Sequence, residues 1–120
     1  MDKKILLVDD AAFMRMMIKD ALTKNGYTNI IEAADGEQAC LQYTAEKPDL
    51  VIMDITMPNK TGIEALRDIK AADPKAKIVM CSAMGQESMV VEAIKLGALD
   101  FIVKPFKPDR ILQTVSKILG

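Results

Sequence analysis

Histidine and tryptophan are both absent from the 120 residues of this chain. Without histidine, the chain has no Ser-His or Cys-His catalytic pair, no histidine-ligated metal and no phosphohistidine of its own. Cysteine is scarce, and the two that occur, Cys40 and Cys81, form no CxxC motif. Neither a zinc site nor a disulfide is therefore expected, and both cysteines are interpreted as small buried apolar residues of a cytosolic protein.

An excess of either charge is also lacking, because 16 Lys and Arg residues nearly balance 17 Asp and Glu residues. A chain without a basic field is not expected to bind nucleic acid or an anionic membrane directly. Its apolar runs are too short to span a membrane. A length of 120 residues fits one domain with a single core. We therefore expect a cytoplasmic, monomeric protein in which residues 1–120 form one domain.

Short apolar runs alternate with helical patterns along the whole chain. The runs predict strands at residues 4–8, 28–33, 50–53, 77–81 and 100–103. A helix is expected after each strand. This alternation is typical of the α/β class and predicts a doubly wound, five-stranded parallel sheet of order 2-1-3-4-5. As in flavodoxin-like folds, five helices would cover both of its faces.

Capping residues mark where several of these helices begin. Asp35 with Gln38, and Thr61 with Glu64, match the capping-box pattern of a helix start. The helix that begins after Thr61 is expected to stop before Asp73 and Pro74. The fourth helix is expected over residues 86–96.

Helical spacing also predicts which side chains face the core. In the first helix the apolar stripe comprises Phe13, Met14, Met17, Ile18, Ala21 and Leu22. In the fourth helix it comprises Val90, Ala93, Ile94 and Gly97. Met89 and Val91 then point elsewhere, and two interpretations of them stay open: part of a partner site, or incidental apolar surface.

Polar side chains stand at four of the predicted strand ends. Asp9 and Asp10 follow the first strand, Asp54 the third, Ser82 the fourth and Lys104 the fifth. Each alone fits a structural role, as a helix cap, a turn hydroxyl or a solvated cation. In a doubly wound sheet, however, ligands bind beyond the carboxyl ends of the strands, which meet at one edge. We therefore expect these side chains to converge on one site.

Three carboxylates at one edge repel one another and raise the pKa of at least one of them unless a cation lies nearby. Because only oxygen ligands are offered, a hard cation is favoured, and Mg²⁺ suits a site with few carboxylates. The ammonium of Lys104 and the hydroxyl of Ser82 are donors that suit a phosphoryl oxygen. An aspartate can take up a phosphoryl group as an acyl phosphate. The pattern thus predicts a metal-assisted phosphoryl site.

Together, Asp9, Asp10, Asp54, Ser82 and Lys104 resemble the residue set of the receiver domains of two-component response regulators. The resemblance extends over the whole chain. The strings DDAAFMRMM, MDITMP, CSAMGQ and DFIVKPF are similar, more specifically, to those of the stand-alone chemotaxis regulators in this family. The resemblance implies that Asp54 is the phosphoacceptor and that Lys104 pairs with the phosphoryl oxygens.

The resemblance also implies a metal site and a switch. Asp9, Asp10 and Asp54 would hold Mg²⁺ together with the backbone carbonyl of Thr56. The peptide bond between residues 104 and 105 is expected to be cis.

Two residues depart from the commoner pattern of the family. Ser82, the implied switch hydroxyl, stands where threonine is frequent, and Phe101, the implied coupled aromatic, stands where many members carry tyrosine. Because Phe101 has no hydroxyl, its ring can carry a signal only through burial.

The implied function is a phosphorylation-activated signalling switch, not an enzyme that turns over a separate substrate. Since the chain lacks histidine, its phosphodonor must be a separate kinase, and the resemblance implies a histidine kinase of the chemotaxis type. The implied target is the flagellar switch protein, and a phosphatase is a further implied partner. Because the chain ends after its last predicted helix, no DNA-binding output domain is expected.

Other functions stay open at this point. The chain can be a phosphorelay intermediate or an isolated receiver fragment of a larger regulator. A phosphohydrolase similar to haloacid dehalogenases uses the same residue types but needs a second acid where Thr56 stands. A flavodoxin-like cofactor binder needs a phosphate loop after the first strand, where Asp9 and Asp10 would repel phosphate, and the chain has no tryptophan to flank a flavin.

Overall fold

Five parallel strands form one sheet in the computed structural model, which describes residues 3–120. Their bounds are Lys4–Val8 (β1), Asn29–Ala33 (β2), Leu50–Asp54 (β3), Ile78–Ala83 (β4) and Asp100–Lys104 (β5). The order in the sheet is β2-β1-β3-β4-β5, so the predicted topology is confirmed. Strands β3, β4 and β5 run further than predicted, and Asp54, Ser82 and Lys104 therefore belong to the strands rather than to the loops after them.

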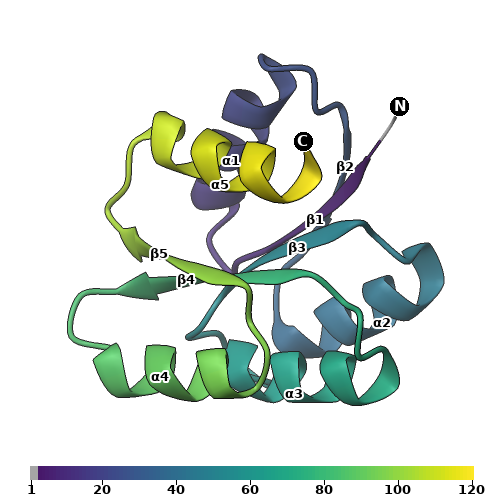
Figure 1. Cartoon of the computed structure of the whole chain (residues 1–120), viewed down its shortest axis with the longest axis vertical. Helices are drawn as coiled ribbons and strands as arrows, with labels where there is room; N and C mark the ends of the chain where they lie inside the picture. Colours follow the sequence, from purple (N-terminus) through teal and green to yellow (C-terminus); the bar gives the residue numbers. More distant parts are fainter. Residues whose placement is uncertain (1–2) are drawn as a thin grey trace.

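A helix follows each strand, as predicted. The helices are α1 (Ala12–Thr23), α2 (Gly36–Glu46), α3 (Gly62–Ala72), α4 (Glu87–Lys95) and α5 (Pro108–Leu119). Helices α1 and α5 lie on one face of the sheet, and α2, α3 and α4 lie on the other (Figure 1). Over residues 3–120, none of the helices is long and apolar enough to cross a membrane.

Strand β1, which lies between β2 and β3, has buried side chains on both of its faces. Ile5 and Leu7 belong to the core beneath α1 and α5, whereas Leu6 and Val8 belong to the core beneath α2 and α3. All four side chains are at most 2% exposed. Because both faces of this strand are covered, its sequence is a continuous apolar run and does not alternate between apolar and polar residues. Such a packed centre fixes the position of the residues that follow β1 and its neighbour β3.

One predicted capping box is confirmed and the other is half wrong. At the start of α3, the Glu64 N–H donates to Thr61 Oγ1 at 3.2 Å and the Thr61 N–H donates to Glu64 Oε1 at 3.0 Å. At the start of α2, the Gln38 N–H donates to Asp35 Oδ1 at 2.8 Å, as predicted. The reciprocal bond is different: with Asp35 extended at φ −155°, Gln38 Oε1 accepts from the Ala34 N–H instead.

Two side chains predicted to face the core are exposed. Phe13 is 69% exposed because the first turn of α1 lies past the end of β1, where the sheet offers no surface to pack against. Ile94 is 45% exposed because it borders a groove between α4 and β5. Met89 and Val91 are exposed, as predicted.

The two cysteines differ in their surroundings. Cys81 is buried in β4, and burial raises the pKa of its thiol to about 12. It therefore remains a protonated, apolar filler, as predicted, and a poor metal ligand. Cys40 is only half-buried, so the prediction holds for it in part. Both thiols are free.

Candidate functional site

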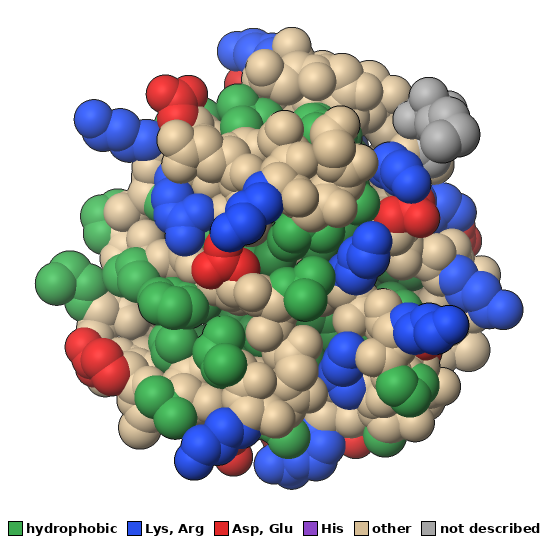
Figure 2. Space-filling view, in the orientation of Figure 1, with side chains coloured by type: hydrophobic (Ala, Val, Ile, Leu, Met, Phe, Trp, Pro, Cys, Tyr) green, Lys and Arg blue, Asp and Glu red, His purple; other side chains and the backbone are tan. Residues whose placement is uncertain are grey.

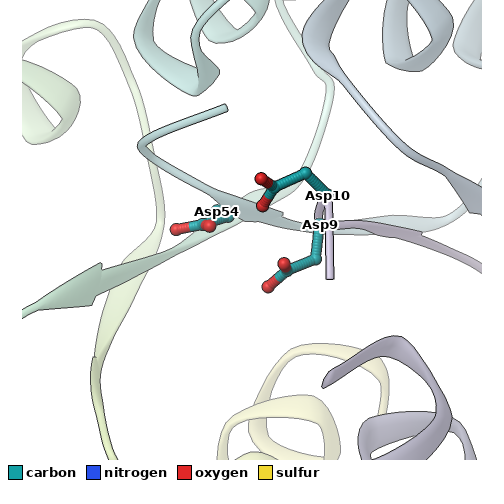
Figure 3. Close-up of side chains that lie close together, drawn as sticks. All are labelled: Asp9, Asp10 and Asp54. Carbon is teal, nitrogen blue, oxygen red and sulfur yellow. The ribbon is translucent and has the colours of Figure 1, made fainter. Parts of the chain in front are cut away.

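Three carboxylates meet at the carboxyl ends of β1 and β3. Asp54 is the last residue of β3, and Asp9 and Asp10 follow β1, which pairs with β3 in parallel. Carboxylate oxygens from the three residues lie within 4.8 Å of one another. Figure 3 shows the three carboxyl groups gathered beyond the strand ends. The structure thus brings Asp54 against the adjacent pair Asp9 and Asp10, which lies in a distant part of the chain.

Asp9 is held by its own neighbours. It is only 4% exposed, and its Oδ1 accepts a hydrogen bond from the Ala11 N–H at 2.9 Å. The Arg15 guanidinium donates to the Asp9 backbone carbonyl and also pairs with Glu32 at 2.9 Å. Sequence reasoning missed Arg15, because nothing in the spacing of α1 shows that this cation turns toward the end of β1. Asp10, in contrast, is exposed.

Lys104 reaches these carboxylates from β5. Its Nζ lies 2.9 Å from Asp9 Oδ2 and 3.3 Å from Asp54 Oδ2. Burial alone lowers the pKa of Lys104, but the hydrogen bond to Asp9 and the charge of Asp54 outweigh burial and raise it. At Asp54, burial and repulsion from Asp9 raise the pKa in spite of the nearby ammonium of Lys104. The site therefore holds a firmly charged lysine beside a carboxylate that is partly desolvated.

The donor set of the carboxylate trio fits a small hard cation. Its ligand atoms are all carboxylate oxygens, which bind Mg²⁺ and Ca²⁺ in preference to soft metals. Because Lys104 neutralises part of the charge on Asp9 and Asp54, the trio suits an ion that keeps several of its waters. Mg²⁺ binds in this way, so the residues present fit it.

The remaining predicted residues lie around the trio. Ser82 is 1% exposed and directly follows Cys81, which is in register with Asp54. Thr56 lies two residues past Asp54, is exposed, and accepts a hydrogen bond on Oγ1 from Gln86 Nε2 at 2.7 Å. Sequence reasoning interpreted Gln86 only as the start of a helix and did not predict this contact.

An apolar groove of about 720 Å³ opens beside the site, between α4 and strands β4 and β5. Its lining includes Ser82, Phe101, Val103, Val91 and Ile94. Figure 2 shows hydrophobic side chains gathered on this part of the surface. Phe101 is 37% exposed and lies in the groove instead of at the carboxylates. Because Ser82 both follows the strand partner of Asp54 and lines the groove, it connects the two regions.

Gly62 lets the start of α3 lie directly against the end of β3. A Cβ atom at this position would lie 2.0 Å from the Asp54 carbonyl oxygen and 2.9 Å from Ile55 Cα. The Gly62 N–H donates to the Ile55 carbonyl at 2.8 Å. Contacts this short exclude every side chain, so the close approach requires glycine.

Most of the chain, residues 5–116, matches the response regulator receiver domain. The chain belongs to this family. It is 60% identical over 120 residues to the chemotaxis protein CheY of Bacillus subtilis (strain 168), and the match covers 100% of both chains.

Solved structures show the same likeness. The CheX–CheY–BeF₃–Mg²⁺ complex from Borrelia burgdorferi matches with a TM-score of 0.92 at 37% identity, over 98% of this chain and 90% of that one. NtrX from Brucella abortus matches with a TM-score of 0.92 at 34% identity, over 99% of this chain but only 27% of that longer chain. Among similar proteins, this receiver domain therefore matches both a whole protein and one part of a larger protein.

These likenesses confirm the resemblance to stand-alone chemotaxis regulators that the sequence strings indicated. CheY-like receiver domains act in phosphorylation-dependent signalling, with a histidine kinase as phosphodonor, and receiver domains bind Mg²⁺ at an acidic pocket. The Lys104–Pro105 peptide bond is cis, as the resemblance implied. The dehalogenase-like and flavodoxin-like interpretations gain no support from the family match.

Proposed function

We propose that this protein is a phosphorylation-activated signalling switch in which Asp54 accepts a phosphoryl group from a histidine kinase. Residues 1–120 act as one receiver domain, whose phosphorylated form binds a protein target. One observation carries the proposal: Asp54 lies where the carboxylates of Asp9 and Asp10 meet the ammonium of Lys104. This grouping supplies a nucleophile, ligands for a cation and a positive charge for the phosphoryl oxygens.

The chemistry is a transfer from a phosphohistidine of the kinase. An Asp54 carboxylate oxygen forms a P–O bond as the P–N bond breaks. The electron pair of that bond leaves on the imidazole nitrogen, which takes up a proton from solvent. Lys104 Nζ, 3.3 Å from Asp54 Oδ2, is close enough to donate hydrogen bonds to the phosphoryl oxygens. The Ser82 hydroxyl is the second donor in this proposal.

Asp9, Asp10 and Asp54, with the backbone carbonyl of Thr56, would hold Mg²⁺. When bound, the ion neutralises negative charge shared by the carboxylates and the phosphoryl oxygens. The fixed position of Asp9, set by its bonds to Ala11 and Lys104, supports its role as a ligand. The complex of a similar CheY with BeF₃ and Mg²⁺ supports the choice of ion.

The target of the phosphorylated form is the flagellar switch protein, bound over the apolar groove. Movement of Ser82 toward the phosphoryl group vacates space beside Phe101, and the ring turns inward through packing alone because it has no hydroxyl. The partly exposed ring and the exposed Val91 support a docking surface here. The CheX–CheY complex supports a further protein partner, which we propose to be a phosphatase.

Incubation with a small phosphodonor tests this function. The protein is mixed with acetyl phosphate and Mg²⁺, its intact mass is measured, and the modified residue is mapped. We expect a single phosphoryl group on Asp54, lost in Asp54→Asn and after chelation of Mg²⁺. The matched control is Asp49→Asn, at the exposed position just before β3, which should be labelled like the wild type. A label on another side chain of the native protein overturns the assignment.

A further inference from the structure

We propose that Gln86 occupies a hydrogen-bond donor that the phosphoryl group takes over on phosphorylation. In the unphosphorylated protein its carboxamide holds the Ala83 N–H, and on phosphorylation it gives up that N–H to a phosphoryl oxygen on Asp54. The inference rests on the proposed function, because it takes Asp54 as the phosphoacceptor.

The Ala83 N–H donates to the side chain of Gln86 and not to a carbonyl of the neighbouring strand. The Ile55 N–H donates to the Cys81 carbonyl at 3.0 Å. In a parallel ladder, the Ile55 carbonyl would then accept a hydrogen bond from the N–H of Ala83, two residues further along β4. That carbonyl instead accepts from the Gly62 N–H at 2.8 Å. The Ala83 N–H is therefore left over at the end of the ladder, and it donates to Gln86 Oε1 at 2.6 Å.

The same carboxamide joins the end of β4 to the loop after β3. Gln86 Nε2 donates to Thr56 Oγ1 at 2.7 Å and lies 3.8 Å from Met89 Sδ. Gln86 occupies the N-cap position of α4, yet its side chain makes no capping bond to that helix. The carboxamide therefore holds the end of β4 and the loop after β3 together at the first turn of α4.

Both bonds of Gln86 end beside Asp54. Thr56 is two residues past it, and Ala83 is in register with Lys104, whose Nζ lies 3.3 Å from Asp54 Oδ2. A phosphoryl group lengthens the Asp54 side chain beyond the strand ends, toward this region. Because its oxygens are charged, they accept a hydrogen bond more strongly than an amide oxygen does. They therefore displace Gln86 Oε1 from the Ala83 N–H.

Displacement of Gln86 directly affects the apolar groove, which is the proposed docking surface. Gln86 and Ala83 both line the apolar groove, and α4 forms one of its walls. Once the bond to Ala83 is broken, the carboxamide no longer ties the end of β4 to the first turn of α4, which can then shift relative to β5 and reshape the groove. This route from site to surface is separate from the one through Ser82 and Phe101.

A titration with beryllofluoride, a phosphoryl mimic, tests the inference in the presence of Mg²⁺. Gln86→Ala removes the group that the mimic must displace, so its half-saturating concentration should fall about two- to tenfold, the factor that one hydrogen bond represents. Thr56→Val, which breaks only one bond of the carboxamide, should produce a smaller fall. Gln113→Ala, an exposed glutamine of α5, is the control and should match the wild type. An equal or higher value for Gln86→Ala overturns the inference.

Amide hydrogen exchange gives a readout that a merely structural role would not change. The Ala83 amide should be protected in the free wild type, exposed to exchange in free Gln86→Ala, and protected in both once beryllofluoride is bound. If the Gln86 carboxamide resonances of the wild type do not move on binding, the carboxamide has kept its bonds and the inference is wrong.

The Asp54→Asn variant separates the two proposals. If it binds beryllofluoride like the wild type, Asp54 is not the acceptor and the proposed function fails. If it loses binding while Gln86→Ala behaves like the wild type, the function stands and only the role of Gln86 is overturned.

Discussion

The ammonium of Lys104 lies 2.9 Å from the carboxylate of Asp9, although the two residues are 95 positions apart in the chain. Strands β3 and β4 lie between β1 and β5 in the sheet, so this one side chain reaches across their ends. The Asp9 side chain is 5% exposed and that of Lys104 is 20% exposed. A pair this sheltered is screened by salt far less than a surface pair. It ties the first strand to the last at the rim that carries the site.

Replacing Lys104 with methionine should therefore destabilise the fold. The variant keeps the apolar stem but leaves the carboxylates of Asp9 and Asp54 without their cation. We expect the free energy of unfolding in urea to fall by roughly 1–3 kcal/mol. Lys107→Met, at an exposed position, is the control, and its change should stay within about 0.5 kcal/mol. Equal stability of the two variants would show that the carboxylates do not depend on Lys104.

Removal of Asp10 should have opposite effects with and without metal. Without the ion, Asp10→Ala relieves repulsion from Asp9 and Asp54 and should stabilise the fold by on the order of 1 kcal/mol. With Mg²⁺, the variant should gain less thermal stability than the wild type, since a ligand is missing. Thermal unfolding with and without Mg²⁺ measures both effects, and Asp20→Ala on the exposed face of α1 serves as the control. An unchanged response to Mg²⁺ would exclude Asp10 as a ligand.

Phe101→Ala should separate phosphorylation from target binding. The ring lies in the groove and away from the carboxylates, so labelling with acetyl phosphate should remain close to that of the wild type. Binding of the phosphorylated form to the flagellar switch protein, measured by calorimetry, should weaken by about tenfold or more. Phe13→Ala removes a more exposed ring from α1 and is the matched control. Equal target affinity for the two variants would mean that Phe101 does not couple the site to the surface.

Acid should weaken the start of α2 through Asp35. Its carboxylate accepts hydrogen bonds from the Gln38 N–H at 2.8 Å and from Asn59 Nδ2 at 3.0 Å, and these bonds lower its pKa. Because the folded pKa lies below the unfolded one, the bonds stabilise the fold fully above about pH 4. That stabilisation is lost as the pH falls through the folded pKa.

Urea unfolding at a series of pH values between about 5 and 2.5 measures this loss. In Asp35→Asn the amide still caps the helix but does not titrate in this range, so its stability should fall less steeply with acid than that of the wild type. Asp20→Asn, at an exposed position, should follow the wild-type curve. Parallel curves for Asp35→Asn and the wild type would refute the link between this carboxylate and acid stability.

The strands and the carboxylate trio could be predicted because both depend on short-range features of the sequence. A strand buried on both faces, such as β1, appears as an unbroken apolar run, and a polar residue at its end is visible at once. The meeting of Asp9 with Asp54 then follows from the parallel order of β1 and β3. The family resemblance added roles to these residues that their spacing alone does not indicate.

Side-chain placement at the edges of the fold could not be predicted in the same way. Helical spacing shows which face of α4 is the more apolar. It does not reveal that Ile94 borders a groove, where no neighbouring helix covers it. The contact of Gln86 with Ala83 depends on Gly62 having taken the Ile55 carbonyl, which no local pattern records. Such contacts arise from the meeting of three chain segments and become visible only in the folded molecule.

Gly62 also limits how this chain can change over generations. Any replacement at this position adds a carbon atom 2.0 Å from the carbonyl oxygen of Asp54, so α3 cannot remain against β3. An amino-acid replacement at residue 62 therefore disturbs the backbone of a residue eight positions earlier without touching its side chain. Descendants that keep this packing of α3 on β3 must keep glycine there, and a library randomised at position 62 should return little else among its folded members.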